Sequence, residues 1–429
     1  MKDVVVDEVR CPSETAGGWR QLVDENVPAS KSLLGRYWRA LERLELGVSL
    51  SAERVARASL REGAQILHLR THRGVEIDVC DESSLMTTGT YKDLDACLVS
   101  VLTTAAEVGQ VAVSSGGNLG YALSVYGAHV GLRSFFFQPK TTMYKLDATS
   151  FAWGGAKLIS VDLPERQVKS LTAAFARNFN IVMVPDIRWR LAASAVRAMF
   201  ILEHTEARRV DWLAQTMCAG YGPAGIYNCF SELVREGMVD RLAIPKFLGF
   251  QQDANAPMVN AWAGGHREIM AAHIQPQPDQ YIEPGLYNTN PERNYTRLFD
   301  LMRHYGGDLR ALDRDAYDRY GELALGWLRD VGLNLTRVPG RPDEILEKTG
   351  LLTLVGVIAA IEEGRLEPGQ RILAMVTGGF RQMSGFNPPT PDVEVDASLT
   401  EEAWVHRLGE HFGLRPFTYS RQTDRLYPR

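Results

Sequence analysis

Hydrophobic and polar positions alternate in two different ways between about residue 95 and residue 184. Helical spacing of apolar residues predicts helices over 95–108, 120–129, 144–153 and 165–179. Short apolar runs predict strands over 111–114, 134–138, 157–161 and 181–184, and further strands over 213–218, 246–250 and 371–376. Such alternation is typical of an α/β protein in which helices cover a mostly parallel sheet.

The same pattern suggests how the chain divides into domains. We expect a small mobile α/β domain over residues 95–190 and a larger domain that combines residues 1–94 with residues 191–429. A chain of 429 residues with 45% hydrophobic content can bury one or two full cores, and its length suggests two or three domains. The segment 275–294, rich in proline, asparagine and tyrosine, is predicted to be a long loop. It could line a site, although a solvated connection is the commoner outcome.

A lysine follows a threonine-glycine turn at the start of a helical stretch. The sequence is TTGTYKDLDA from Thr87 to Ala96, and the lysine is Lys92. A lysine amine attacks an aldehyde only in its deprotonated form, so a rigid and partly desolvated position favours a Schiff base with a cofactor. A single lysine is more often a solvated surface residue. Lys92 is a candidate because of the motifs that follow it.

A glycine-rich turn follows the predicted strand over 111–114, in the stretch VAVSSGGNLG that begins at Val111. Small residues let backbone donors approach a ligand, and the Asn118 amide can donate a hydrogen bond to a phenolic oxygen. An ordinary strand-to-helix turn has the same composition.

A second glycine-rich turn lies in the stretch CAGYGPAGIYNCF from Cys218 to Phe230. Gly220, Gly222 and Gly225 would expose backbone N–H groups and the positive end of a helix dipole, which is typical of a phosphate site. The letters also match the dinucleotide pattern G-x-G-x-x-G, so nicotinamide or flavin binding is an alternative. Dinucleotide folds usually carry that pattern on the first strand of a βαβ unit, whereas this one lies in mid-chain.

A third motif is the buried-type strand RILAMVTGGFR, Arg371 to Arg381, which ends at Thr377. A neutral threonine hydroxyl beside a pyridine nitrogen need not protonate it. An uncharged ring is a weaker electron sink, which suits elimination and replacement better than transamination. Thr377 could equally just end a strand before a glycine turn.

In this order, TGTYKD, SGGN, GYGPAG and VTGG resemble the pyridoxal-phosphate enzymes of the tryptophan-synthase β fold, known as fold type II. The similarity spans roughly residues 85–385. Within the family the chain looks most like threonine synthase and cysteate synthase, on the stretches GRYW at Gly35–Trp38, QQDANAPMVNAW at Gln251–Trp262 and EKTGLLTLVGVIAAI at Glu347–Ile361. The resemblance implies a two-domain fold, pyridoxal 5′-phosphate (PLP) as cofactor and a homodimer.

The resemblance also implies roles for individual residues. Lys92 would bind the cofactor aldehyde, Asn118 the cofactor O3′ and Thr377 the pyridine nitrogen. The 5′-phosphate loop would consist of Gly220, Tyr221, Gly222, Pro223, Ala224 and Gly225. The substrate would contact Thr88, Ser115, Gly116, Gly117, Arg188 and Arg190.

Departures from the family pattern leave the substrate open. Leu119 stands where a threonine often helps to hold the substrate carboxylate, and Gly116 where a serine is frequent. The stretch PDIRWRL, residues 185–191, keeps two arginines but lacks the small polar donors that grip a phosphate leaving group. Guanidinium groups bind phosphate, sulfonate and carboxylate alike. We therefore expect an anionic amino-acid substrate.

The expected reaction is β-replacement or elimination on an O-activated amino acid such as O-phosphoserine, as in cysteate synthase. The alternative is γ-elimination with β-addition on O-phosphohomoserine, as in threonine synthase. It is less favoured because Cys11 stands alone where several relatives have a metal-binding knuckle, and because the phosphate grip is altered. Outside this class, an NAD-dependent oxidoreductase would explain GYGPAG alone, and a catalytically silent PLP-binding sensor is a further alternative.

Composition narrows the other possibilities. The net charge is −5 and no basic block occurs, which argues against nucleic-acid binding. No apolar run approaches the ~20 residues that cross a bilayer, and MKDVVVDEVRCPSE lacks a signal-peptide core, so we expect a cytoplasmic protein. Five cysteines without a C-x-x-C pair, and nine histidines without ligand spacing, predict neither disulfides nor a metal site.

Overall fold

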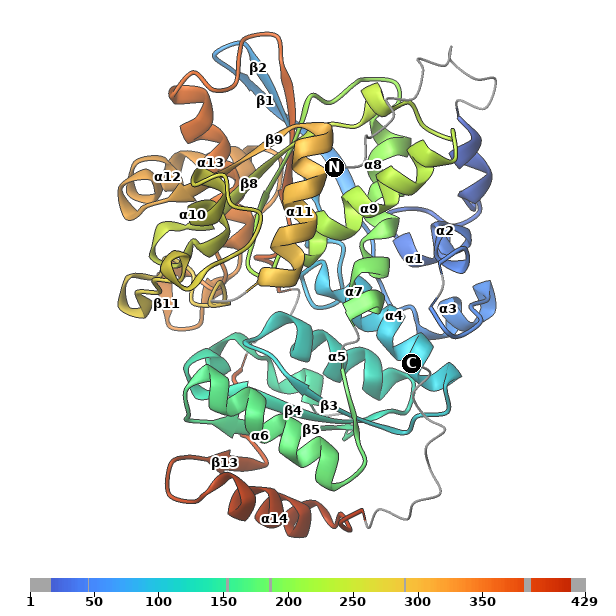
Figure 1. Ribbon diagram of the computed structural model, residues 1–429, viewed down its shortest axis with the longest axis vertical. Helices are drawn as coiled ribbons and strands as arrows, with labels where there is room; N and C mark the ends of the chain where they lie inside the picture. The colour runs from blue at the N-terminus through green and yellow to red at the C-terminus, as the bar shows by residue number, and fades with distance from the viewer. Residues whose placement is uncertain are drawn as a thin grey trace, which may run out of the picture. The chain divides into compact units, whose positions relative to one another are not determined.

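The computed structural model describes residues 17–44, 46–151, 154–184, 187–288, 291–381 and 387–417 (Figure 1). The chain divides into two compact units. The first unit comprises residues 1–95 and 187–382, and the second comprises residues 96–186 and 383–429. Parallel sheets flanked by helices form both units, which confirms the predicted α/β class.

In the described residues, the first unit contains a six-stranded sheet of order β1-β2-β12-β7-β8-β9. The strands are β1 (Gln65–His72), β2 (Val75–Asp81), β7 (Trp212–Thr216), β8 (Lys246–Gln252), β9 (Gly307–Leu312) and β12 (Arg371–Val376). β1 and β2 form an antiparallel hairpin, and the other neighbouring pairs are parallel. Parallel strands end at one edge of a sheet, where α/β proteins place their ligands. The ends of β2, β12 and β7 are therefore neighbours.

Helices and short turns complete this unit. Its α-helices are α1 (Leu33–Arg36), α2 (Trp38–Glu42), α3 (Ala52–Ala58), α7 (Ile187–Ala193), α8 (Ala195–Thr205), α9 (Tyr221–Arg235), α10 (Pro257–Ala263), α11 (Glu292–Tyr305), α12 (Arg314–Asp330) and α13 (Thr349–Glu362). α4 (Lys92–Ala105) begins in the first unit and continues in the second. The 3-10 turns are η1 (Gly18–Leu22), η4 (Arg241–Ala243), η5 (Asp253–Asn255), η6 (Ala271–His273) and η7 (Pro278–Gln280), and β10 (Arg337–Val338) pairs with β11 (Arg341–Ile345).

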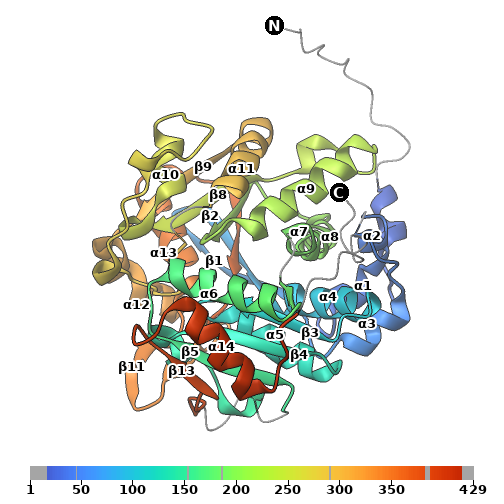
Figure 2. The ribbon, with the colours of Figure 1, turned by 60° about the horizontal axis from the view of Figure 1, so that its bottom comes forward.

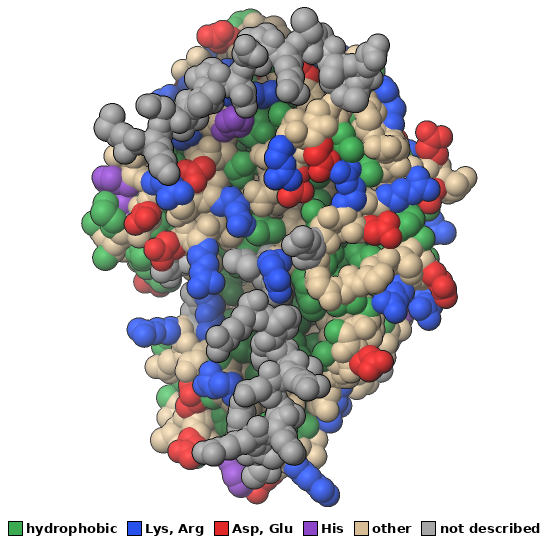
Figure 3. Space-filling view, turned by 45° about the vertical axis from the view of Figure 1, so that its right-hand side comes forward, with side chains coloured by type: hydrophobic (Ala, Val, Ile, Leu, Met, Phe, Trp, Pro, Cys, Tyr) green, Lys and Arg blue, Asp and Glu red, His purple; other side chains and the backbone are tan. Residues whose placement is uncertain are grey.

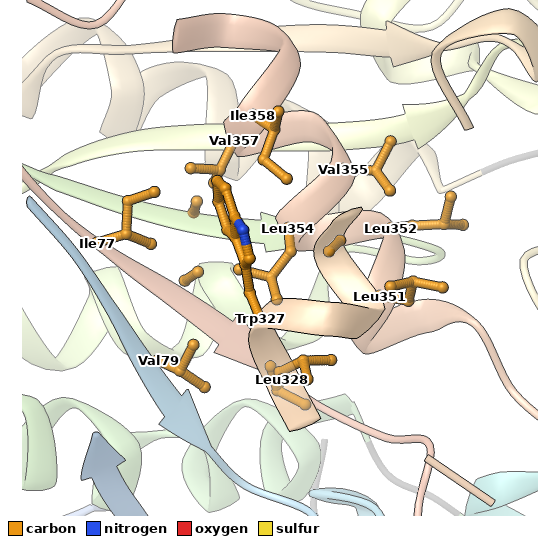
Figure 4. Close-up of a cluster of buried hydrophobic side chains, with 14 of the residues drawn as sticks. Ile77, Val79, Trp327, Leu328, Leu351, Leu352, Leu354, Val355, Val357 and Ile358 are labelled. Carbon is orange, nitrogen blue, oxygen red and sulfur yellow. The ribbon is translucent and has the colours of Figure 1, made fainter. Parts of the chain in front are cut away.

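The core of the first unit gathers around α13, which is apolar on almost every face. A helix of that kind is stable only when it is buried on all sides. Figure 4 shows its leucine, valine and isoleucine side chains beside Trp327 of α12 and beside Ile77 and Val79 of β2. Gly356 allows the closest approach, since a Cβ there would lie 2.6 Å from the ring of Phe250. The core thus fixes β2, β7 and β12, whose ends carry the site.

The second unit has a parallel sheet of order β13-β5-β4-β3-β6 among the described residues. Its strands are β3 (Gln110–Ser114), β4 (Arg133–Pro139), β5 (Ala156–Val161), β6 (Val182–Met183) and β13 (Val393–Val395). The helices are α5 (Asn118–His129), α6 (Glu165–Asn178) and α14 (Glu401–Phe412) (Figure 2). Phe175 of α6 packs edge-on against Phe135 and Phe137 of β4, at ring distances of 5.1 and 5.3 Å. These elements match the predicted ones closely.

The helix predicted over 144–153 is wrong. Two short 3-10 turns occupy most of this stretch, η2 (Lys140–Lys145) and η3 (Ala148–Phe151), and residues 152 and 153 lie outside the described residues. Leu146 separates the turns because its backbone is extended, with ψ of 149°, and its side chain is fully buried. Burial of this one leucine outweighs the helical spacing of its neighbours.

The C-terminal boundary also differs from the expected division, which placed residues 191–429 in the larger domain. Residues after 382 group with the second unit instead. β13 pairs with β5, and α14 packs against α6. Trp404 and Leu408 of α14 belong to the core of that unit.

The segment 275–294 is exposed over residues 275–280, which include η7, and is buried or half-buried over residues 281–288, while residues 289 and 290 lie outside the described residues. The buried amide of Gln252 accepts hydrogen bonds from the backbone N–H groups of Ile282 and Glu283, at 2.9 and 3.0 Å. It also donates to the carbonyl oxygens of Glu283 and Leu286. The part of the loop around residues 282–286 can be buried because one glutamine at the end of β8 satisfies its polar backbone.

In the described part of the chain, no helix combines the length and apolarity needed to span a bilayer. Basic and acidic side chains both occur on the face shown in Figure 3, with apolar and uncharged side chains between them.

Candidate active site

The turn before Lys92 is held by its own polar groups. The backbone N–H of Thr88 donates to Asp93 Oδ2 at 2.8 Å, and the Thr88 hydroxyl donates to Asp93 Oδ1. Gly89 has a φ of +76°, a left-handed conformation that favours glycine. A Cβ at Gly89 would lie 2.5 Å from the carbonyl carbon of Phe380. The TG pair of the motif is therefore required both by backbone angle and by space.

This turn is attached to the end of β12. The backbone N–H of Tyr91 donates to the carbonyl oxygen of Thr377 at 3.1 Å, and Thr90 forms a bridge with Gly378. The Thr377 side chain is 5% exposed. Two motifs that lie far apart in the sequence are thus adjacent in the first unit.

The Lys92 amine lies in a partly buried polar environment at the first residue of α4. Its side chain is 14% exposed, and its Nζ donates to Asp95 Oδ2 at 3.0 Å and to the Tyr91 hydroxyl. The same Nζ lies 3.8 Å from the centre of the Tyr91 ring. Asp95, only 1% exposed, gives the amine a fixed direction.

Arg190 of α7 meets the same carboxylate. Its Nε lies 3.5 Å from Asp95 Oδ2, and its guanidinium carbon lies 3.7 Å from the centre of the Tyr221 ring, at the start of α9. Arg188 on the same helix is exposed. The two arginines of the motif therefore differ in exposure, and Arg190 is held beside Lys92 through a shared partner.

The predicted phosphate loop forms the start of α9. Gly220 precedes the helix with a φ of +75°, and no side chain caps this end of the helix. Gly225 packs against α7 and α8, since a Cβ there would lie 2.6 Å from Ser194 Cβ. Gly222 faces side chains of the first unit, and a Cβ there would lie 3.0 Å from Gln215 Nε2. A Cβ at Gly222 would thus fill the space in front of the helix N-terminus.

A buried ion pair, which the sequence did not predict, lies beside this loop. Arg197 of α8 is completely buried and binds Glu82 with two nitrogens, Nε at 2.6 Å and Nη2 at 2.5 Å, while Nη2 also donates to Gln215 Oε1 at 2.9 Å. Burial alone would lower the Arg197 pKa, but the charge and hydrogen bonds of Glu82 raise it, so the guanidinium stays charged. The only signal in the sequence was a single arginine inside the apolar stretch AVRAMFIL.

The SGGN motif lies in the second unit, between β3 and α5. The backbone N–H of Gly117 donates to Ser115 Oγ at 3.3 Å, and Gly117 has a φ of +152° directly before Asn118 begins the helix. Gly116 completes the turn. The motif therefore forms a strand-to-helix turn as predicted, whereas Lys92, Thr377 and the α9 loop belong to the first unit.

The buried Asp93 carboxyl should make the free energy of unfolding depend on pH. Complete burial raises its pKa from 3.8 to about 7, although the hydrogen bonds from Thr88 oppose the shift. The folded protein favours the protonated form, so this stabilisation is complete below about pH 4 and is lost as the pH rises through about 7. Between about pH 4 and pH 7, the free energy of unfolding of the wild type should therefore fall by up to about 4 kcal/mol relative to that of Asp93→Asn. Urea unfolding at several pH values measures this.

The exposed Asp330 supplies the control, because Asp330→Asn changes a carboxylate that water already solvates. A pH profile of Asp93→Asn that runs parallel to that of the wild type would contradict the assigned shift.

Comparison with known proteins identifies the class. A family model described as pyridoxal-phosphate-dependent enzyme matches residues 65–378, which is most of the chain, and the chain belongs to this family. The predicted cofactor, PLP, is thereby confirmed. The residues present also fit this group: a partly buried lysine amine, an uncapped helix start in front of Gly222, and a buried threonine at the end of β12.

Curated relatives are similar at modest identity. Cysteate synthase from Methanosphaerula palustris is 25% identical over 302 residues, which is 68% of this chain and 67% of that protein. Threonine synthase from Synechocystis is 26% identical over 197 residues, 44% of this chain and 49% of that protein. The chain thus spans about half the length of that threonine synthase. It is a PLP-dependent enzyme of fold type II related to both, which confirms the expected family.

Solved structures agree on the fold. Threonine deaminase isoform 2 from Solanum lycopersicum superposes with a TM-score of 0.55 at 14% identity, covering 96% of this chain and 99% of that one. O-ureido-L-serine synthase gives a TM-score of 0.54 at 16% identity, covering 80% and 96%. At these identities the likeness shows the fold and leaves the reaction open.

Proposed function

We propose that the enzyme catalyses β-replacement or elimination on an O-activated amino acid such as O-phosphoserine, in the manner of cysteate synthase. The observation that carries the proposal is the arrangement of Lys92, Asp95 and Arg190, in which one buried carboxylate holds an amine at 3.0 Å and lies 3.5 Å from a guanidinium. This places a proton-transfer group next to a cation that can bind an anionic substrate. The similarity to cysteate synthase over 68% of the chain supports the same class.

The roles of the residues follow from their chemistry. PLP, when bound, supplies the electron sink that stabilises negative charge at the substrate Cα. Lys92 removes the Cα proton and returns it, and Asp95 keeps its amine in place. Arg190 neutralises the phosphate or carboxylate of the substrate. A nucleophile such as sulfite then adds at Cβ after the leaving group has departed.

Other residues hold the cofactor and the substrate in this proposal. The loop from Gly220 to Gly225 binds the 5′-phosphate through backbone N–H groups and the helix dipole. Thr377 faces the ring nitrogen, Asn118 binds the phenolic oxygen, and the turn of Ser115, Gly116 and Gly117 binds the substrate carboxylate. Thr88 acts through the turn, because its hydroxyl is already bonded to Asp93. We further propose a cytoplasmic homodimer, which light scattering tests for its subunit number.

A substrate screen tests the reaction. The full chain, supplied with PLP, is offered O-phosphoserine, O-acetylserine, O-phosphohomoserine and O-succinylhomoserine, each with sulfite, sulfide or water. We expect phosphate release from O-phosphoserine and a sulfonate product with sulfite, both followed by mass spectrometry. Threonine from O-phosphohomoserine would instead establish the threonine-synthase alternative. Absence of turnover with every donor, in a protein that holds PLP, would leave the silent sensor.

Arg190 should decide the preference for a phosphate donor. Loss of a charge-assisted hydrogen bond costs about 1.5–3 kcal/mol, so Arg190→Gln should raise KM for O-phosphoserine roughly 10- to 100-fold and change KM for O-acetylserine little. Arg209→Gln is the control, since Arg209 is an exposed arginine of the same unit with no assigned role in the site. An equal rise of KM for both donors would assign Arg190 to the substrate carboxylate instead.

The nicotinamide alternative is tested separately. It accounts for the GYGPAG turn but gives no purpose to Lys92 or Thr377, which adjoin each other through Tyr91. Thermal shift with PLP and with NAD distinguishes the two, and stabilisation by NAD alone would favour an oxidoreductase.

A further inference from the structure

One side-chain nitrogen of the buried Arg197 makes no hydrogen bond to the described residues. Arg197 uses Nε and Nη2 for Glu82 and Gln215, and its Nη1 has no hydrogen-bond partner among the described residues. The residue is 0% exposed. An unsatisfied charged donor in such a place is costly, so native proteins rarely keep one without a protein group, an ordered water or a ligand to accept its hydrogen bond. A structural role for Arg197 opposite Glu82 explains two of its nitrogens and leaves the third unexplained.

The spare nitrogen faces the start of α9. A Cβ on Gly222 would lie 2.6 Å from Nη1, which places this nitrogen directly beside the second helical residue. Gln215 Nε2 would lie 3.0 Å from the same Cβ. Glycine at this position therefore lets two side-chain donors lie next to the second helical residue.

The start of α9 is itself short of donors. An α-helix normally offers four free N–H groups at its N-terminus, but Pro223, the third helical residue, has none. The N–H of Ala224 makes the first helical hydrogen bond, to the carbonyl oxygen of Gly220 at 3.2 Å, so the N–H that Pro223 lacks is one of the four that would otherwise be free. An anion with several oxygens would thus need a further donor, and Arg197 lies where it can supply one.

The guanidinium is held in a fixed orientation. Glu82 binds it in two-pronged fashion, and the guanidinium carbon lies 4.5 Å from the centre of the Tyr91 ring. Tyr91 also accepts the hydrogen bond from Lys92. The spare nitrogen, the loop and the catalytic lysine therefore belong to one connected cluster within the first unit.

We propose that Arg197 donates from Nη1 to the 5′-phosphate of PLP and replaces the donor that Pro223 removes. Glu82 and Gln215 are positioning residues that orient the guanidinium. The cation offsets part of the phosphate charge in a site where water is excluded. The enzyme then distinguishes PLP from pyridoxal, which lacks the phosphate, by a charged side chain as well as by backbone groups. This proposal depends on the cofactor and not on which amino acid is turned over.

Cofactor affinity tests the proposal. The full chain is titrated with PLP and, separately, with pyridoxal, and binding is followed by the visible absorbance of the bound chromophore. Arg197→Lys keeps a charge opposite Glu82 but has a single nitrogen, so PLP should bind roughly 10- to 100-fold more weakly. Pyridoxal affinity should stay within about 3-fold, because no phosphate contact is lost. A merely structural role would weaken both compounds alike or neither, and either result would overturn the proposal.

A second variant removes the pair as a whole. In Arg197→Met with Glu82→Gln no buried carboxylate is left without its cation, so the fold is less at risk than in a single substitution. The same selective loss of PLP affinity is expected. The matched control is Arg36→Met with Glu203→Gln, which removes another ion pair anchored on α8. That control should leave the affinities for PLP and pyridoxal unchanged, and a loss of PLP affinity there would also overturn the proposal.

Discussion

Lys92→Ala should lower turnover by roughly 10³-fold or more and leave the protein folded. The amine is the group that exchanges the Cα proton in the proposed reaction, and alanine removes it. Alanine is the best helix former, so the start of α4 should remain intact. Steady-state rates and circular dichroism measure the two effects.

Three observations separate a chemical role from a structural one. Lys31→Ala removes an exposed lysine of the same unit and should leave the rate unchanged. Borohydride reduction followed by peptide mapping should locate the cofactor on Lys92, and small external amines should restore part of the activity of Lys92→Ala. Wild-type turnover in a folded Lys92→Ala protein would remove this residue from the chemistry.

Gly89→Ala is expected to have the largest effect on stability. A side chain at a φ of +76° is strained, and the new methyl group would overlap the carbonyl group of Phe380, which is backbone and cannot rotate away. We expect a loss of about 4 kcal/mol or more, or no folded protein. Because this turn carries Lys92, any folded fraction should also bind PLP more weakly. Thermal or urea unfolding gives the free energy.

Gly332→Ala isolates the contribution of the backbone angle. Gly332 has a φ of +82°, and a Cβ there would have nothing within 4 Å. Only the left-handed strain remains, about 1–2 kcal/mol. Equal losses in Gly89→Ala and Gly332→Ala would show that the turn moves to admit the methyl group, and that the close approach to Phe380 is not required.

The comparison of sequence with structure separates local from distant effects. Strands over 111–114 and 371–376 were predicted within a residue or two, because apolar runs between turn residues are a local signal. The helix over 144–153 failed since the burial of Leu146 is decided by its tertiary surroundings. The segment 275–294 was predicted to be a long loop, and the burial of its residues 282–286 depends on Gln252, which belongs to β8.

The sequence by itself determined the family, the cofactor, the two glycine-rich strand-to-helix turns, and the places of Lys92 at a helix start and Thr377 after a strand. These features are local, because each depends on residues that are close in the sequence. Examples are a glycine that adopts a left-handed backbone angle and a lysine in the first turn of a helix. Only the tertiary structure decided that Arg197 meets Glu82, 115 residues away, and that residues after 382 join the second unit. Such contacts depend on which buried surfaces pack against each other. The hydrophobic periodicity of the sequence does not specify which distant segments will pack together.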